Sequence, residues 1–74
     1  MQNIFDKEFL KVLRKHIAVH RKAKRLTQLD LAIRMDNHAE QIGRIERGKL
    51  NVSICTLKKI VEALEIPLHD LLKF

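Results

Sequence analysis

A chain of 74 residues can form one small domain, but it is too short to enclose a large substrate pocket. Fifteen Lys and Arg against nine Asp and Glu give a net charge of +6, which favours an anionic partner: nucleic acid, a membrane surface or an acidic protein. The single cysteine, Cys55, excludes an internal disulfide, and no stretch is typical of a signal peptide or a membrane span, so we expect a cytoplasmic protein. Two glycines, one proline and no alternating β-branched run predict an all-α fold.

The apolar spacing predicts five helices in a single domain that spans residues 1–74. We expect Asn3 to cap a first helix that runs to about Lys24. Its core-facing positions are predicted to be Phe5, Phe9, Val12, Leu13 and Ile17. Its last turn is rich in cations, namely Arg21, Lys22, Lys24 and Arg25. These cations form either a solvated helix end or a set of phosphate contacts.

Two short helices joined by a tight turn are predicted to follow. Thr27 is a suitable cap for a helix over residues 28–35, in which the small Ala32 permits close helix contact. The turn contains Asp36 and Asn37, because Asp and Asn tolerate a left-handed backbone better than other non-glycine residues. The inward positions of this pair of helices are predicted to be Leu31, Met35, Ile42 and Ile45. A third helix over about 39–47 ends at Gly48, where a C-terminal glycine is expected.

The rest of the chain is predicted to form two more helices. Ser53 caps a fourth helix that runs to about Leu64. Its buried stripe is Leu57, Ile60, Val61 and Leu64. Ile66 and Pro67 interrupt the pattern, and a short fifth helix carries Leu68, Leu71 and Leu72.

The pattern at about 28–47 predicts a helix-turn-helix. The residues that carry a family resemblance are Thr27, Gln28, Leu31, Ala32, Ile42, Ile45, Glu46, Arg47 and Gly48. Through them the chain resembles the Xre family, the Cro and phage-repressor type of DNA-binding protein, over roughly Leu13 to Leu72. The resemblance implies a compact five-helix lambda-repressor-like domain, with the helix-turn-helix at its second and third helices. It leaves about residues 1–12 as an N-terminal extension of the first helix, and it implies a structural ion pair between Arg21 and Glu46.

Helical spacing places Glu40, Gly43, Arg44 and Arg47 opposite the inward side of the third helix. With the resemblance, the predicted contacts to base edges of double-stranded DNA come from His38, Ala39, Glu40, Gly43 and Arg44. The predicted phosphate contacts come from Thr27, Gln28, Arg47, Lys49 and Asn51. A glycine inside a helix is unfavourable, so Gly43 indicates either close approach of the helix to DNA or no functional role.

A unit of this size contacts only a few base pairs, which favours a homodimer on a palindromic operator. The predicted dimer surface is Leu50, Ile66, Leu68, Leu72 and Phe74. The alternative is that these residues close the core of the monomer. For Leu68, and for the neighbouring Leu71, we expect burial in the core, and for Leu72 and Phe74 both interpretations remain open.

No arrangement of nucleophile, base and acid predicts an enzyme, and no cofactor is implied. His16 and His20 lie four residues apart but lack a third ligand, so no metal site is predicted. The chain also has no Tyr or Trp for stacking single-stranded bases. The predicted function is a sequence-specific transcriptional regulator, a homodimeric repressor at its own promoter. The alternatives are an antitoxin that also binds a toxin protein, and a controller protein of a restriction-modification system.

Overall fold

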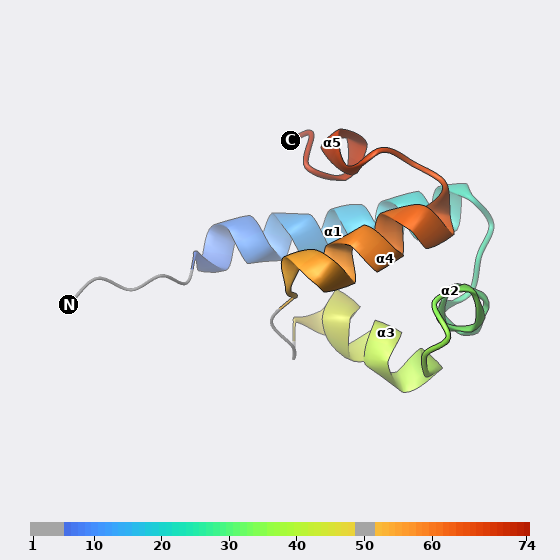
Figure 1. Ribbon diagram of the computed structural model, residues 1–74. Helices are drawn as coiled ribbons and strands as arrows, with labels where there is room; N and C mark the ends of the chain where they lie inside the picture. Colours follow the sequence, from blue (N-terminus) through green and yellow to red (C-terminus); the bar gives the residue numbers. More distant parts are fainter. Residues whose placement is uncertain (1–5, 49–51) are drawn as a thin grey trace.

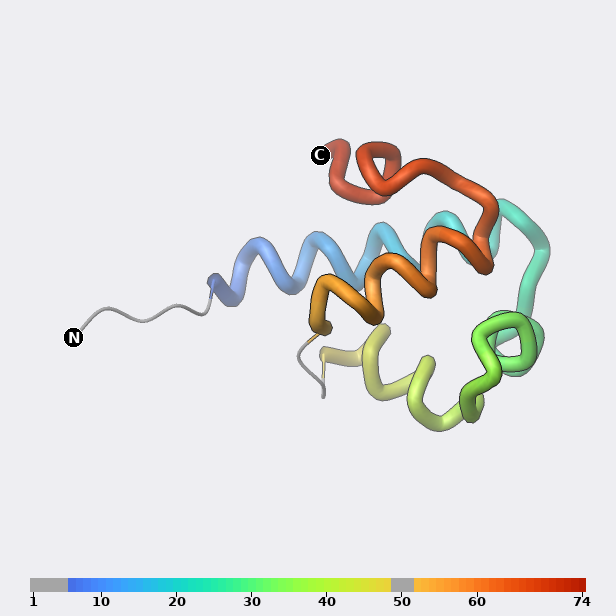
Figure 2. The backbone as a smooth tube through the Cα atoms, viewed as in Figure 1, coloured from blue at the N-terminus to red at the C-terminus, as the bar shows by residue number. Residues whose placement is uncertain are grey.

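The computed structural model describes residues 6–48 and 52–74. These residues form helices and no strand, which confirms the all-helical prediction. The helices are α1 (Lys7–Ala23), α2 (Gln28–Arg34), α3 (Ala39–Arg47), α4 (Ile54–Leu64) and α5 (Leu68–Leu71). The long helix α1 runs alongside α4, with α3 below this pair, α2 at one end and α5 above them (Figure 1). The tube drawing shows the same order and places the C-terminus beside α5 (Figure 2).

Helix α1 begins later than the sequence pattern predicts. Its cap is Asp6, whose carboxylate accepts a hydrogen bond from the Phe9 backbone N–H at 2.9 Å, whereas Asn3 lies outside the described residues. The expectation that Phe9 faces the core is wrong, because its side chain is 44% exposed. The N-terminal end of α1 projects past the other helices (Figure 1), and Phe9 is not among the buried core residues. Instead Phe9 lies against Phe74, with ring centroids 5.4 Å apart.

The α2–turn–α3 unit is held by local hydrogen bonds. The Thr27 hydroxyl accepts from the Asp30 backbone N–H at 3.0 Å, and the Asp30 carboxylate accepts from the Thr27 N–H at 2.8 Å. This reciprocal capping fixes the start of α2. Asp36 adopts the left-handed conformation expected of the turn, with φ of 53°. Gly48 ends α3 with φ of 77°, a conformation that favours glycine.

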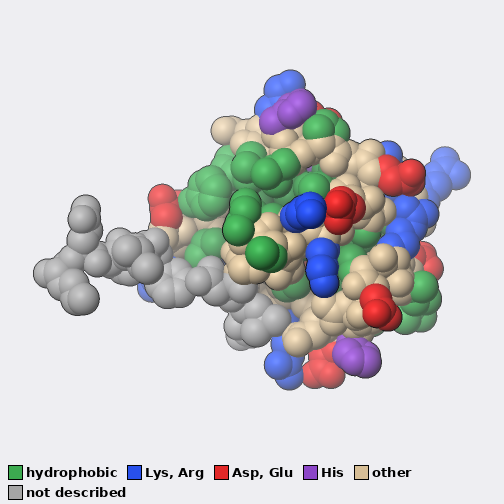
Figure 3. All heavy atoms as spheres, in the orientation of Figure 1, with side chains coloured by type: hydrophobic (Ala, Val, Ile, Leu, Met, Phe, Trp, Pro, Cys, Tyr) green, Lys and Arg blue, Asp and Glu red, His purple; other side chains and the backbone are tan. Residues whose placement is uncertain are grey.

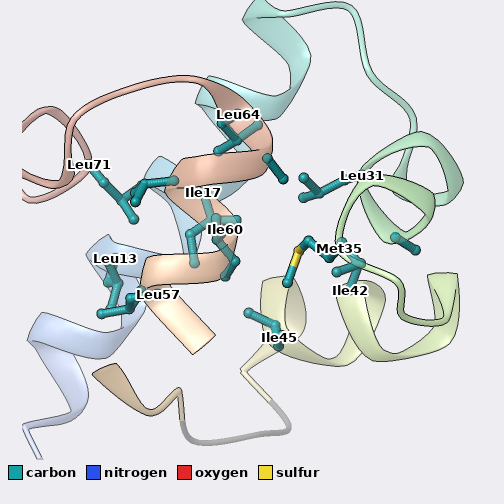
Figure 4. Close-up of a cluster of buried hydrophobic side chains, with 13 residues drawn as sticks. Leu13, Ile17, Leu31, Met35, Ile42, Ile45, Leu57, Ile60, Leu64 and Leu71 are labelled. Carbon is teal, nitrogen blue, oxygen red and sulfur yellow. The ribbon is translucent and has the colours of Figure 1, made fainter. Parts of the chain in front are cut away.

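One hydrophobic core joins the helices. Its buried members are Leu13, Ile17, Leu31, Ala32, Met35, Ile42, Ile45, Leu57, Ile60, Val61, Ala63, Leu64 and Leu71. The labelled side chains point inward from every helix, with Met35 and Ile42 of the α2–α3 unit facing Ile60 of α4 (Figure 4). Full burial of one such aliphatic side chain contributes about 1.5–3 kcal/mol. The core therefore anchors the inner side of α3 and leaves its outer side free for function.

The C-terminal residues divide between core and surface. Leu71 is fully buried, and Ile66 and Leu68 pack partly against the core. Leu72 and Phe74 are 36% and 54% exposed. The space-filling view shows hydrophobic side chains gathered near the N-terminal half of α1 and the C-terminal part of the chain (Figure 3).

Candidate nucleic-acid interface

Arg21 and Glu46 form an ion pair that connects α1 to α3. The Arg21 Nε donates to Glu46 Oε2 at 2.7 Å, and its second terminal nitrogen donates to Glu46 Oε1 at 3.0 Å. The remaining terminal nitrogen donates to the Leu26 carbonyl oxygen at 2.7 Å. The two side chains are only 9% and 8% exposed. A two-point contact of this kind fixes orientation as well as distance, because the guanidinium and the carboxylate must lie in a defined plane.

Gln28 attaches α2 to the same carboxylate. Its Nε2 donates to Glu46 Oε1 at 3.2 Å, while its backbone begins α2. The Glu46 side chain therefore accepts hydrogen bonds from both α1 and α2. We call this group of three residues, Arg21, Gln28 and Glu46, the Glu46 hub. Its hydrogen bonds hold α3 at a fixed angle to α2. Gln28 is a predicted phosphate contact, and the structure places it half-buried at the start of α2, with its amide nitrogen donating to Glu46.

The outer side of α3 carries a second ion pair. The Arg44 guanidinium donates to Glu40 Oε1 at 2.9 Å, across one helical turn. These side chains are 48% and 73% exposed. An exposed pair at this spacing contributes only about 0.3–0.5 kcal/mol, so a stronger partner can replace either contact. His38 is also exposed and precedes α3, whereas Ala39 packs partly against the core.

Gly43 lies on this side of α3 but is buried by other side chains. A β-carbon at this position would lie 2.9 Å from a terminal nitrogen of Arg47 and 3.2 Å from Gln28 Oε1. The two explanations that the sequence left open were close approach to DNA and no role. The structure supplies a third: the glycine leaves room for the ends of Arg47 and Gln28.

The other predicted phosphate contacts lie around the start of α2 and the end of α3. Thr27 and Arg47 are exposed, and Lys49 and Asn51 lie outside the described residues. Two groups of Thr27 lower the pKa of Asp30 below its ordinary value of 3.8. The larger effect comes from the Thr27 backbone N–H, and the smaller one comes from its hydroxyl. Asp30 is therefore charged at neutral pH and supports the capping contact.

Arg14 is a structural residue that the sequence analysis did not single out. Its guanidinium donates to the Glu46 carbonyl oxygen at 3.4 Å and lies against Gly48, where a β-carbon would collide with it. The sequence does indicate this role, because Arg14 lies seven residues before Arg21 and therefore on the same side of α1. The two arginines together secure the last turn of α3.

Neither a metal site nor a membrane-spanning helix appears in the described residues. In 6–48 and 52–74, no three His, Cys, Asp or Glu side chains are grouped to hold a metal ion. Over the same residues, none of the helices combines the length and apolar character needed to cross a membrane.

Comparison with known proteins assigns the family. A model of the helix-turn-helix family HTH_3 matches residues 17–71. The chain belongs to the Xre-type helix-turn-helix family. Its fold is also similar to the crystal structure of the restriction-modification controller protein C.AhdI from Aeromonas hydrophila, with 30% sequence identity and a TM-score of 0.80 over 89% of this chain and 98% of that one. A search of curated protein sequences gave no match.

The family and the structural match identify the protein as a DNA-binding transcriptional regulator. In helix-turn-helix proteins the second helix of the motif lies in the major groove, and α3 is the second helix of the motif in this chain. The outer side of α3 described above is therefore the candidate reading surface, and the Glu46 hub is the support behind it.

Proposed function

We propose that this Xre-type protein is a sequence-specific repressor that binds, as a homodimer, to a palindromic operator at its own promoter in the cytoplasm. The observation that carries the proposal is the exposed Arg44–Glu40 pair on α3, a helix whose opposite side is fixed by the buried Glu46 hub. Sequence-specific binding requires a helix whose position is fixed and whose exposed polar side chains can exchange their partners for base edges. The two sides of α3 supply these two properties.

The exposed pair suits a G·C-containing half-site. A guanidinium such as that of Arg44 binds the O6 and N7 atoms of guanine through two hydrogen bonds, and a carboxylate such as that of Glu40 accepts from cytosine N4. Ala39 has a methyl side chain that suits contact with a thymine methyl group. His38, exposed before the first turn of α3, is proposed to reach the adjacent base pair. The proposed base contacts therefore extend from the residue before α3 to Arg44.

Phosphate contacts are proposed to set the register of α3 in the groove. Thr27 and Gln28 lie at the start of α2, where their side chains are proposed to contact a phosphate. Arg47 extends the contact to the end of α3, and Lys49 and Asn51 are proposed to continue it. These contacts supply affinity for any sequence but do not discriminate between bases.

A homodimer is proposed to form through the C-terminal residues. Leu72 and Phe74 are exposed apolar side chains, and Phe74 lies between Phe9 and His16 of α1, with ring centroids at 5.4 and 4.9 Å. Ile66 and Leu68, which pack partly against the core, are proposed to complete the surface together with Leu50, which lies outside the described residues. Two-fold pairing through this surface would present two α3 helices about 34 Å, or a multiple of it, apart.

The second candidate is a restriction-modification controller. It is favoured by the similarity to the controller protein C.AhdI, which covers 89% of this chain. Both candidates bind DNA through α3, and they differ in which promoter they regulate. Footprinting on the chain's own upstream region and on those of its neighbouring genes separates them, because a restriction gene under the same operator identifies a controller.

The deciding experiment is binding to a labelled duplex from the upstream region, against a scrambled duplex, at about 50 and 200 mM salt. Selective binding at both salt concentrations, with a two-fold symmetric footprint, supports the proposal. Equal binding to both duplexes that disappears at the higher salt concentration contradicts it, because only charge attraction then remains. That result would favour the antitoxin alternative, with the N-terminal segment at about 1–12, which includes Phe9, as the surface for a toxin protein.

A further inference from the structure

Gly43 is the feature of α3 that the proposed function leaves unexplained. It lies in the middle of a nine-residue helix, where glycine is about 1 kcal/mol less favourable than alanine. Its backbone is helical, so the position does not need a glycine for its φ angle. A different requirement must therefore account for the missing side chain, and the surroundings of Gly43 indicate what it is.

Two side-chain ends occupy the space that a β-carbon would take. A terminal nitrogen of Arg47 lies 2.9 Å from that position, and the central guanidinium carbon lies 3.6 Å from it. The guanidinium of Arg47 is therefore folded back by one turn along the outer side of α3. Gln28 Oε1 lies 3.2 Å from the same position, so the start of α2 also borders the space that the glycine leaves.

The Gln28 amide has a fixed direction at this point. Its nitrogen donates to Glu46 inside the hub, which leaves its oxygen directed toward the Gly43 site. An amide oxygen accepts hydrogen bonds and does not donate them, so it attracts a guanidinium and repels a phosphate oxygen. In this arrangement, Arg47 adds a charged side-chain donor for a phosphate between α2 and α3, beside the second N–H of the Gln28 amide.

We propose that Gly43 is a positioning residue for Arg47: the absence of a side chain lets the guanidinium lie back along α3 near Gln28, where it serves as a phosphate donor between α2 and α3. This inference rests on the proposed function, since it specifies how that function's phosphate contact is made. A charge-assisted contact to phosphate depends strongly on geometry. Displacing the guanidinium would therefore weaken binding to every sequence and not only to the operator.

The test is a double-mutant cycle of Gly43→Ala, Arg47→Ala and the double variant. The nearest atom to the new β-carbon is the end of a flexible arginine, so Gly43→Ala should fold and should melt at the wild-type temperature or above. Its affinity for both operator and scrambled duplex should fall about tenfold. The slope of log affinity against log salt concentration should become less steep by about one unit, which is the contribution of one phosphate contact.

The cycle separates positioning from other effects of the new methyl group. In the Arg47→Ala background, Gly43→Ala should cause no further loss of affinity. A further loss would overturn the inference, because the methyl group would then act on the DNA or on Gln28. Wild-type affinity of the Gly43→Ala variant would overturn it as well, with the proposed function intact. Failure of the wild-type protein to select its operator would instead overturn both.

Discussion

Helix α3 takes part in two Arg–Glu ion pairs that are alike in distance and opposite in surroundings. Arg21 and Glu46 approach to 2.7 Å with side chains 9% and 8% exposed, and Arg44 and Glu40 approach to 2.9 Å with side chains 48% and 73% exposed. The distances are almost equal, yet only the buried pair has lost its contact with water. Burial, and not distance, decides what each pair does.

The buried pair cannot exchange partners without exposing an unpaired charge in the protein interior, so it fixes the angle of α3. The exposed pair can exchange either partner for water or for a base edge at a small cost. In the free protein it holds the two proposed reading groups close to each other on the helix surface. One helix thus combines a rigid side with an adaptable side, which is the combination that a DNA-reading element needs.

The strongest test of this contrast is to remove one partner from the buried pair. Arg21→Ala leaves Glu46 buried with only its contact to Gln28, and the free energy of unfolding should fall by about 3–5 kcal/mol. Urea denaturation followed by circular dichroism measures the loss. In a domain of this size, such a loss removes much of the total stability, so weak DNA binding by this variant would report unfolding.

The matched control replaces both partners with apolar residues. Arg21→Met combined with Glu46→Leu removes the unpaired charge, so this double variant should be more stable than Arg21→Ala. An Arg21→Ala variant with the wild-type urea midpoint would contradict the structural role of the pair.

Removing one partner of the exposed pair should leave the fold intact and change recognition. Arg44→Ala should alter the free energy of unfolding by less than about 0.5 kcal/mol. It should cost about 1–3 kcal/mol of binding to the operator and much less on scrambled duplex, because a base contact carries the discrimination. Competition binding with both duplexes measures the ratio.

Lys59→Ala, at an exposed position on α4, is the control for the loss of one positive charge. It should leave the ratio of operator to scrambled binding unchanged. Equal losses on both duplexes for Arg44→Ala would show that Arg44 contacts phosphate and not bases.

The sequence was sufficient to predict the helices and most of the core. Ser53 and Thr27 have the side chains that cap helices, and the structure uses both. The prediction failed at Phe9, because helical spacing shows which residues share one side of a helix but not where the neighbouring helices end. The same limit applied to Asn3, because Asp6 offered a second suitable cap closer to the packed part of α1.

The site was harder to predict, because its contacts join residues distant along the chain. The direction of the Gln28 amide and the position of the Arg47 guanidinium depend on their contacts around Gly43, and no periodic pattern contains that information. Charge and spacing predicted that Arg44 and Glu40 lie on the outer side of α3. They did not predict that these two side chains pair with each other.

The contrast between buried and exposed positions extends to the apolar C-terminal residues. Leu71 is fully buried, whereas Phe74 is 54% exposed. Phe74→Ala should leave the monomer folded, although it removes the contacts of the ring with Phe9 and His16, and it should weaken the proposed dimer by about 1 kcal/mol. Sedimentation velocity over a range of concentrations measures the dimer dissociation constant. Ile33→Ala, at an apolar position that is 67% exposed and outside the proposed surface, is the control. Equal effects of the two variants would contradict the assignment of the surface.

The smallest expected effect concerns Asp30, an exposed carboxylate held by Thr27 at the start of α2. Its pKa in the folded protein is below its ordinary value of 3.8, first because of the Thr27 backbone N–H. The stability it contributes is therefore fully present above that ordinary value and is lost as the pH falls through the lower folded value. Asp30→Asn keeps an acceptor oxygen without the charge, so it should be less stable than wild type at pH 6, and the difference in urea midpoint should narrow below about pH 4. Parallel wild-type and Asp30→Asn profiles through the acid range would mean that the charge does not strengthen the cap. A difference in urea midpoint that disappears at acid pH would show that the charge of Asp30 strengthens the cap. The contribution of this contact would then be intermediate between those of the two ion pairs of α3, because it is exposed like the Arg44–Glu40 pair but has a fixed geometry like the Arg21–Glu46 pair.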